Sequence, residues 1–188
     1  MKNILLTTVL SFMITLTFAQ TPQFRNLDWG TNIQTVKQKE EARFVVQKDN
    51  HLEYMSTLGN YHAGLEYSFT INGKLMGAKY IIDNHFGHTQ NYFDEYNFFS
   101  KLLTEKYGKA AKSTIFTSQE NAKKENLHLM LLKDGKYSQE TQWETSDMAI
   151  KLMLYGTTDN GILTIHYVSK KYKDVNHKAK KEKIIKDL

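Results

Sequence analysis

The sequence predicts an α+β fold: one antiparallel sheet of about six to eight strands, with two main helices packed on one of its faces. Three observations lead to this prediction. Several segments alternate apolar and polar residues with the period of two that half-buried strands have. Two segments, residues 32–41 and 90–107, have the helical period instead. Turn signals made of Gly, Asn and Asp join neighbouring strands as hairpins, which makes those strands antiparallel.

Residues 1–19 have the three parts of a secretory signal peptide. Lys2 supplies a positive charge, residues 4–18 are an uncharged and mainly apolar stretch, and the small residues Thr17 and Ala19 precede the bond after Ala19. The apolar stretch is shorter than the ~20 residues that span a bilayer. We therefore expect cleavage after Ala19 and an exported protein, periplasmic or secreted. The chain has no Cys, so we expect neither a disulfide nor a lipid anchor on that residue.

The first half of the remaining chain is typical of a short helix followed by four strands. Thr31 and Gln34 form a capping-box pattern before the helix over residues 32–41. Short strands are expected at residues 44–46 and 52–55. The clearest strand covers residues 61–71, with an inward face of Tyr61, Ala63, Leu65, Tyr67, Phe69 and Ile71. Asn72-Gly73 predicts a hairpin into a return strand over residues 74–83, with Met76, Ala78, Tyr80 and Ile82 inward.

The second half begins with the strongest helix of the chain, residues 90–107. Its apolar stripe is formed by Tyr92, Tyr96, Phe99 and Leu103, widened by Phe93 and Leu102. Gly108 is suited to the left-handed position that often follows a helix, and we expect this helix to cover the sheet. The strands expected after it are residues 127–132, residues 136–144 beyond Asp134-Gly135, residues 148–155 and residues 162–168.

Residues 20–169 are expected to form a single α+β domain, because no tandem repeat is strong enough to indicate two. Residues 170–188 are a basic tail, expected to be partly helical or disordered, with eight Lys against three acidic residues and a net charge of +5. Residues 20–169 hold 16 Lys and Arg against 17 Asp and Glu. The domain itself is therefore not basic, and we expect no nucleic-acid partner. The tail has two further interpretations, a solvated extension or a segment attracted to anionic lipid or polysaccharide.

Several short motifs follow one another along the chain in a characteristic order. Leu27-Asp28-Trp29-Gly30 opens a helix, Leu65–Phe69 forms a strand, and Lys106-Tyr107-Gly108 ends the second helix before Tyr167-Val168-Ser169. This order resembles small exported α+β domains of unknown function from the Bacteroidetes lineage. It is distantly similar to the helix-plus-antiparallel-sheet domains of β-lactamase-inhibitor-like proteins and of outer-membrane-assembly lipoproteins. The resemblance implies the fold, brings no catalytic residue, and departs from the lipoproteins in the missing Cys.

The common catalytic motifs are absent: the chain has no Gly-rich phosphate loop, no G-x-S-x-G and no H-E-x-x-H. The densest group of candidate metal ligands is Asp83, His85 and His88, which suit Zn²⁺ but equally suit a polar connection between a strand and a helix. A further ligand would have to come from elsewhere, such as His62 or His166. We therefore expect no metal and no cofactor.

Two other sets of residues have both a functional and a structural interpretation. Glu53 and Glu66 fall on neighbouring strands and suit an acid/base pair, but such residues usually face water. Trp29 and Trp143 suit a binding groove, but Trp is more often part of the core. The sheet face that the helices leave uncovered is expected to hold His62, Glu66, Ser68, Thr70 and Lys79.

These observations favour an exported, non-enzymatic binding or accessory protein of the cell envelope, whose partner is another envelope protein. The alternative is a hydrolase or metal-dependent enzyme with a site assembled from distant His and Glu residues. A third hypothesis is a surface adhesin that uses the basic tail. No segment after residue 19 is apolar and long enough to be expected to span a membrane.

Overall fold

The computed structural model describes residues 24–82, 90–117, 125–157 and 160–188. These residues form a mixed α+β fold with one antiparallel sheet of eight strands. The elements are, in chain order, α1 (Ile33–Lys39), β1 (Arg43–Lys48), β2 (His51–Leu58), β3 (Tyr61–Phe69), β4 (Leu75–Ile82), α2 (Gln90–Tyr107), β5 (Lys112–Phe116), α4 (Glu125–Lys133), β6 (Ser138–Glu144), β7 (Met148–Thr157), β8 (Asn160–Ser169) and α5 (Lys170–Asp187). None of the described helices is long and apolar enough to cross a bilayer.

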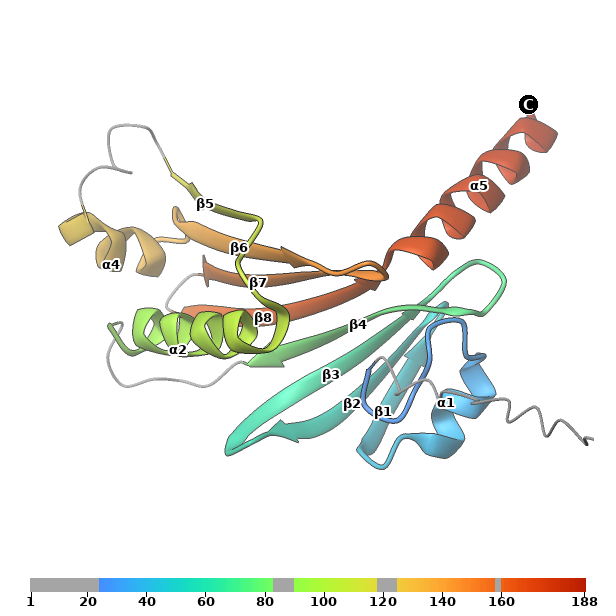
Figure 1. Cartoon of the computed structure of the whole chain (residues 1–188), viewed down its shortest axis with the longest axis horizontal. Coiled ribbons are helices and arrows are strands. Elements are labelled where there is room, and N and C mark those ends of the chain that lie inside the picture. Colours follow the sequence, from blue (N-terminus) through green and yellow to red (C-terminus); the bar gives the residue numbers. More distant parts are fainter. Residues whose placement is uncertain (1–23, 83–89, 118–124, 158–159) are drawn as a thin grey trace, which may run out of the picture.

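The sheet consists of two four-stranded halves that meet at β4 and β8 (Figure 1). The strand order is β1-β2-β3-β4-β8-β7-β6-β5, so each half is a run of sequential strands and the second half is laid down toward the opposite edge. At the junction Ala78 lies opposite Tyr167, and Lys79 lies opposite His166. Because opposed residues of an antiparallel pair point to the same side, this register gives both halves one common buried face and one common outer face.

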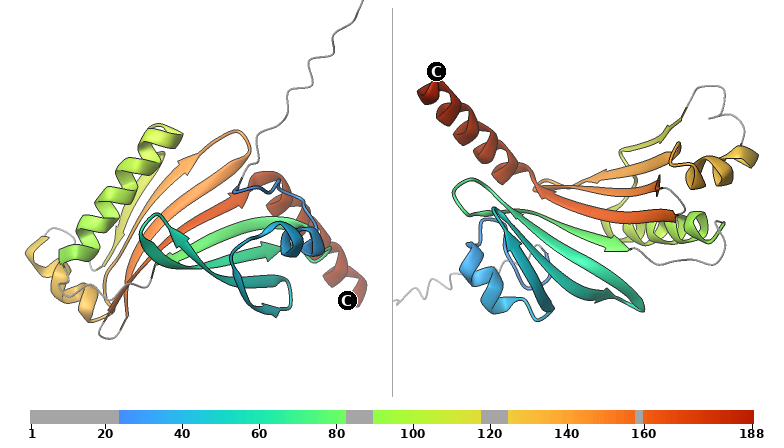
Figure 2. Two further views of the ribbon diagram at one scale, coloured as in Figure 1. Left: turned by 90° about the horizontal axis from the view of Figure 1, so that it is seen from below. Right: turned by 180° about the vertical axis from the view of Figure 1, so that it is seen from behind.

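The buried face carries α1, α2 and α4 together with the loop that precedes α1 (Figure 2). Its strand residues are mainly aromatic and branched aliphatic, and those with at most 1% exposure include Leu52, Leu65, Tyr67, Ile82, Trp143, Ile150, Leu152, Leu154 and Leu163. The predicted fold class, an antiparallel sheet with its main helices on one face, is confirmed. The opposite side, which we call the open face, has no described helix packed across it.

The first half is covered by a short helix and an aromatic loop. Phe24 packs against Tyr67, Tyr80 and Tyr167, with ring centroids 5.9, 5.6 and 4.9 Å away. In α1, Val36 is fully buried, and the helix starts at Asn32, whose side chain accepts a hydrogen bond from the backbone N–H of Thr35. The predicted helix is therefore correct, although its cap is Asn32 and not Thr31.

A buried polar cluster joins this loop to the sheet. The side chain of Glu40 is only 2% exposed and accepts hydrogen bonds from Arg25 Nη2 at 2.9 Å, from the backbone N–H of Ala42 at 2.8 Å and from the Tyr67 hydroxyl. Arg25 Nη1 also donates to the Tyr80 hydroxyl at 3.1 Å. Burial and the nearby Glu40 carboxylate raise the pKa of Tyr67 well above its usual value. We call these residues the Glu40 cluster.

The second half is covered by α2, whose bounds agree with the predicted helix. Tyr92, Tyr96, Phe99 and Leu103 are its buried residues, as the helical spacing predicts. Leu102 is 42% exposed, so the predicted widening of the stripe on that side is wrong. Gly108 has φ +83° and donates its backbone N–H to the carbonyl of Thr104, which ends the helix as expected.

The predicted strand over residues 127–132 is wrong, because Glu125–Lys133 form the helix α4. The run contains Leu, His and Met but no β-branched residue, and its buried side chains His128, Leu131 and Leu132 have helical spacing. Gly135 ends this helix with φ +67°. Its N–H donates to the Leu132 carbonyl and the next N–H donates to the Leu131 carbonyl, which is the pattern of a helix C-cap and not of a hairpin.

On the side away from β7, β6 pairs with β5, a strand that the sequence pattern does not predict. The pairing runs from Lys112 opposite Gln142 to Phe116 opposite Ser138. Most of β5 is exposed, as expected for an edge strand, so it lacks the alternating pattern that reveals half-buried strands. The chain then returns through α4 before it enters β6.

Three positions near the first hairpin, two predicted inward and one predicted outward, are also wrong or displaced. β3 ends at Phe69, and Ile71 is 36% exposed in the following turn. Thr70, predicted on the open face, is 1% exposed, and its hydroxyl accepts a hydrogen bond from the backbone N–H of Lys74. A register shift between Ser68 and Phe69 displaces Met76 from the inward face.

The basic tail is helical: α5 runs from Lys170 to Asp187 and projects from the end of β8 away from the sheet (Figures 1 and 2). Ser169 caps it by accepting a hydrogen bond from the backbone N–H of Tyr172. Asn176, the buried residue of the helix, accepts a hydrogen bond from the backbone N–H of Ile71 at 2.9 Å. Its first two turns are therefore attached to the domain.

Candidate binding surface

The open face is crossed by one transverse row of polar and charged side chains. Strand register places each member directly opposite the next across seven strands, in the order Glu53, Glu66, Lys79, His166, Lys151, Gln142 and Lys112. We call this the charged row. It begins acidic on β2 and β3 and becomes basic from β4 onward, so the two ends of the row differ in charge.

Most charges of this row are paired within the molecule. Lys79 Nζ lies 2.6 Å from Glu66 Oε2, and Lys48 Nζ lies 3.1 Å from Glu53 Oε1. Lys151 Nζ lies 3.0 Å from an oxygen of Glu140, whose side chain is 8% exposed. Burial raises the pKa of Glu140, but hydrogen bonds from Lys151 and Gln142 outweigh it and leave that pKa below its usual value. The row is therefore a fixed pattern of charge and not a set of free side chains.

His166 lies at the centre of the row, between Lys79 and Lys151. Burial and the positive charge of these two lysines lower the pKa of His166 to about 4, while Glu66 acts in the opposite direction. Its Nε2 lies 3.0 Å from the hydroxyl of Thr164. The imidazole is consequently neutral near pH 7 and provides a polar but uncharged centre.

Over the central strands, the rows on either side of the charged row are small or apolar, and His51, Glu140 and Glu144 continue them toward the edges of the sheet. One holds Ser68, Gly77, Val168 and Ala149 in register, and the other holds Met55, Gly64, Ile81, Thr164 and Met153. Small side chains lower the surface there, and a hollow of about 510 Å³ opens over β6, β7 and β8. Its lining includes Lys151, Met153 and His166 from the sheet and Lys170 and Lys173 from α5. The first turn of α5 thus forms one wall of a hollow in the open face.

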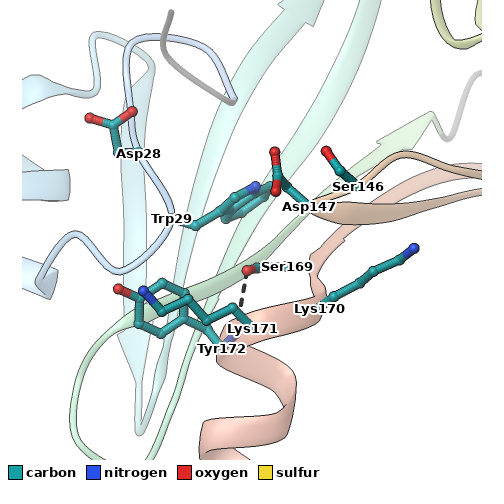
Figure 3. Close-up of a pocket in the computed structure, with 8 residues that line it drawn as sticks. All are labelled: Asp28, Trp29, Ser146, Asp147, Ser169, Lys170, Lys171 and Tyr172. Atoms are coloured by element: carbon teal, nitrogen blue, oxygen red, sulfur yellow. Dashed lines mark hydrogen bonds between the residues drawn. The ribbon is translucent and has the colours of Figure 1, made fainter. Parts of the chain in front are cut away.

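A second hollow, of about 330 Å³, lies where β8 continues into α5 (Figure 3). Trp29 lies beside the β6–β7 turn residue Asp147, and the Tyr172 ring lies on the other side of the opening. Lys170 lines both hollows. A side chain at Gly30 would meet the Tyr172 hydroxyl, since an added Cβ would lie 2.0 Å from its oxygen. Trp29-Gly30 therefore fixes the start of α5 as well as the entry to α1.

The structure brings together some of the predicted site residues and separates others. Glu53 and Glu66 are direct neighbours on β2 and β3, as expected, but each is held by a lysine. His62 is exposed near the start of β3, and His166 is central on β8. Asp83, His85 and His88 lie outside the described residues. Among the residues that the structure describes, no three His, Asp or Glu side chains are grouped closely enough to hold a metal ion.

The two tryptophans have different environments. Trp143 is fully buried, and its Nε1 donates to the Thr104 hydroxyl at 3.3 Å, so it belongs to the core. Trp29 is 8% exposed, packs against Phe24 and lines the smaller hollow. Of the residues predicted on the open face, His62, Glu66, Ser68 and Lys79 lie there in register, whereas Thr70 does not.

The sequence analysis missed the basic part of the charged row. Lys151 and His166 occupy outward positions of two predicted strands, but their alignment with Lys79 and Glu66 depends on the pairing of β4 with β8, which are far apart in the chain. Comparison with known proteins found no matching family model, curated protein or solved structure. The resemblance to small exported domains and to β-lactamase-inhibitor-like domains therefore stays a prediction.

Proposed function

We propose that this chain is an exported, non-enzymatic binding protein of the cell envelope that binds another envelope protein on its open face. The observation that carries the proposal is the open face itself: one side of an eight-stranded sheet that no described helix crosses, with a fixed charged row between stretches of small and apolar residues on the central strands. Surfaces that combine apolar contact area with oriented charges suit protein partners, because burial supplies affinity and the charges fix register.

The size of the face suits a stable complex. Strands about 4.8 Å apart give eight strands a width of about 34 Å, and a strand of about seven residues is about 23 Å long. The product, about 800 Å², is the share that one partner contributes to a standard-size protein interface. The charge pattern favours a partner that presents basic groups over the acidic end of the row at Glu53 and acidic groups over its basic end at Lys112.

The alternative function has less support. A hydrolase or metal-dependent enzyme requires His and carboxylate groups that converge on a pocket, whereas the open-face carboxylates Glu53 and Glu66 are each paired with a lysine.

Export rests on residues 1–19, and it predicts a mature chain that begins at Gln20. The mass of the protein recovered from the envelope or medium tests this directly, and a chain that still carries residues 1–19 would contradict export by cleavage.

The binding proposal is tested by capture from an envelope extract of the source cells, with two matched double variants. K79A/M153A removes one lysine and one methionine from the open face. K101A/M130A removes the same two residue types from exposed positions on α2 and α4. We expect a saturable partner that the wild type and K101A/M130A retain and that K79A/M153A loses at least tenfold.

Melting temperatures of both variants show whether the fold is retained. The ion pair lost with Lys79 is partly exposed, and such pairs contribute about 0–1 kcal/mol, so we expect K79A/M153A to stay folded. A partner that both variants retain equally, or that K101A/M130A loses instead, would contradict the proposal.

A further inference from the structure

The outer turns of α5 form a basic arm that is separate from the open face. Up to Asn176 the helix is attached by Tyr172, which packs beside Gly30, and by the hydrogen bond from Ile71 N–H to Asn176 Oδ1. Beyond that point every residue from 177 to 188 is exposed except Ala179, which is half-buried. Figure 1 and the right view of Figure 2 show α5 projecting away from the sheet. We call residues 177–188 the basic arm.

The basic arm is strongly cationic. It holds five lysines against Glu182 and Asp187, a net charge of +3. Its lysines are Lys178, Lys180, Lys181, Lys183 and Lys186. None of them forms an ion pair with a residue in the described part of the chain. Their charge is therefore directed at the surroundings of the protein.

The end of the arm also exposes large apolar side chains. Ile184 and Ile185 are each 59% exposed, and Leu188 is 99% exposed. At helical spacing, residues 184, 185 and 188 share one side of the helix, so they form a small apolar patch flanked by lysines. A soluble polyanion offers nothing for that patch to contact, whereas a lipid surface offers anionic headgroups and an apolar layer together.

We infer that the basic arm binds the surface of an anionic lipid membrane. Lys180, Lys181 and Lys183 lie against the headgroups, and Ile184, Ile185 and Leu188 enter the interface between headgroups and acyl chains. The arm lies on the membrane and does not cross it. The attached turns of α5 then hold the domain, with its open face available, next to the membrane.

The test is vesicle co-sedimentation of the chain that begins at Gln20, because the apolar residues 4–18 of the precursor would bind lipid by themselves. The vesicles are phosphatidylcholine alone and an equal mixture of phosphatidylcholine and phosphatidylglycerol. We expect binding to the mixed vesicles only, weakened by added salt. Each lysine near an anionic surface strengthens binding roughly fivefold, so K180E/K181E/K183E should lose at least ~100-fold.

A charge-matched control separates the arm from the overall charge of the protein. K101E/K109E/K133E makes the same change at exposed lysines of the domain and should leave binding within about twofold, because α2 and α4 lie away from the arm (Figures 1 and 2). Removal of residues 178–188 should abolish binding and leave the melting temperature unchanged, because Tyr172 and Asn176 remain. I184S/I185S should weaken binding severalfold in high salt, where the apolar contribution dominates.

Three outcomes would overturn the inference. The first is an equal loss of binding in K101E/K109E/K133E and K180E/K181E/K183E, which would indicate diffuse attraction. The second is failure to bind the mixed vesicles at all. The third is that I184S/I185S binds as the wild type does, while soluble alginate competes fully, which would assign the arm to polyanions in general. None of these results bears on the open face, so failure here and failure of the proposed function are distinguishable.

Discussion

The two halves of the sheet are alike in strand order but are covered in different ways. The second half lies under α2, a helix of 18 residues with four buried side chains at regular helical spacing. The first half lies under a helix of seven residues, an aromatic loop and the Glu40 cluster. A four-stranded half of the sheet can therefore be covered either by a long amphipathic helix or by a short helix aided by buried hydrogen bonds. Substitutions in each half distinguish these two kinds of cover.

Gly156→Ala should destabilise the second half most. An added Cβ at this position of β7 would lie 1.8 Å from the carbonyl oxygen of Leu132, so α4 would have to move off the sheet and Leu131 and Leu132 would lose their packing. We expect a loss of about 3 kcal/mol or more in the free energy of unfolding, measured in urea.

The control is Gly59→Ala in the β2–β3 turn, where an added Cβ meets nothing within 4 Å and only the positive φ of +60° is strained. It should cost about 1 kcal/mol. Equal losses in the two variants would show that α4 is not tightly packed on β7.

Glu40→Ala should be the most damaging polar change in the first half. It leaves the Tyr67 hydroxyl, the Ala42 N–H and Arg25 without their buried acceptor. Because Arg25 is 30% exposed and can be rehydrated in part, we expect a loss of about 2–3 kcal/mol in urea unfolding.

A double-mutant cycle of Glu40→Ala with Tyr67→Phe checks this assignment. The two residues are hydrogen-bonded, so a coupling of about 0.5–3 kcal/mol is expected. Additive effects of the two substitutions would show that Glu40 and Tyr67 are not coupled. As a control, Glu105→Ala, an exposed change on α2, should be additive with Tyr67→Phe.

The central His166 should make the sheet sensitive to acid. Its pKa is about 4 in the folded chain and 6.5 in the unfolded one. Between pH 4 and pH 6.5 the unfolded chain therefore binds a proton on this imidazole that the folded chain does not bind. The contribution of His166 to stability is full above pH 6.5 and is lost as the pH falls toward 4. The loss at this site should be about 2 kcal/mol, after allowance for solvent screening.

The measurement is urea unfolding at pH 7 and at pH 4 for the wild type, His166→Gln and His62→Gln. The loss between the two pH values should be smaller in His166→Gln, while His62→Gln, at an exposed position, should follow the wild type. An unchanged loss in His166→Gln would mean that its imidazole is not held neutral by Lys79 and Lys151.

Leu102→Ser should have the smallest effect, although Leu102 belongs to the apolar stripe that the sequence suggests for α2. The side chain is 42% exposed, so the free energy of unfolding should change by about 0.5 kcal/mol or less. Phe99→Ala, on the buried side of the same helix, should cost about 3 kcal/mol or more. A large effect at Leu102 would show that α2 is rotated relative to the sheet.

Much of this architecture follows from local patterns, and the errors have local causes. The alternation in β3 and the stripe of Tyr92, Tyr96, Phe99 and Leu103 are strong signals because each element buries one side only. The run at residues 127–132 is short and apolar throughout, and such runs suit a strand or a helix equally. Asp134-Gly135 suits a hairpin as well as a helix end, because a Gly with positive φ serves both a tight turn and a helix C-cap.

The candidate surface was less predictable than the fold. The local pattern places four residues outward: His62, Glu66, Ser68 and Lys79. It does not reveal that Lys79 stands in one row with His166 and Lys151, because that depends on which distant strands pair. The hollow beside α5 depends further on where the helix leaves β8. Residue spacing along one strand carries no information about either feature.

Lysine labelling of the captured complex shows whether the open face is the binding surface. An amine-reactive reagent is applied to the free chain and to the chain with its captured partner, and modification is read at each lysine by mass spectrometry. If the partner binds the open face, labelling falls at Lys79 and Lys151 and stays constant at Lys101 and Lys133. If labelling falls at Lys101 and Lys133 while Lys79 and Lys151 remain as reactive as in the free chain, the open face is not the binding surface.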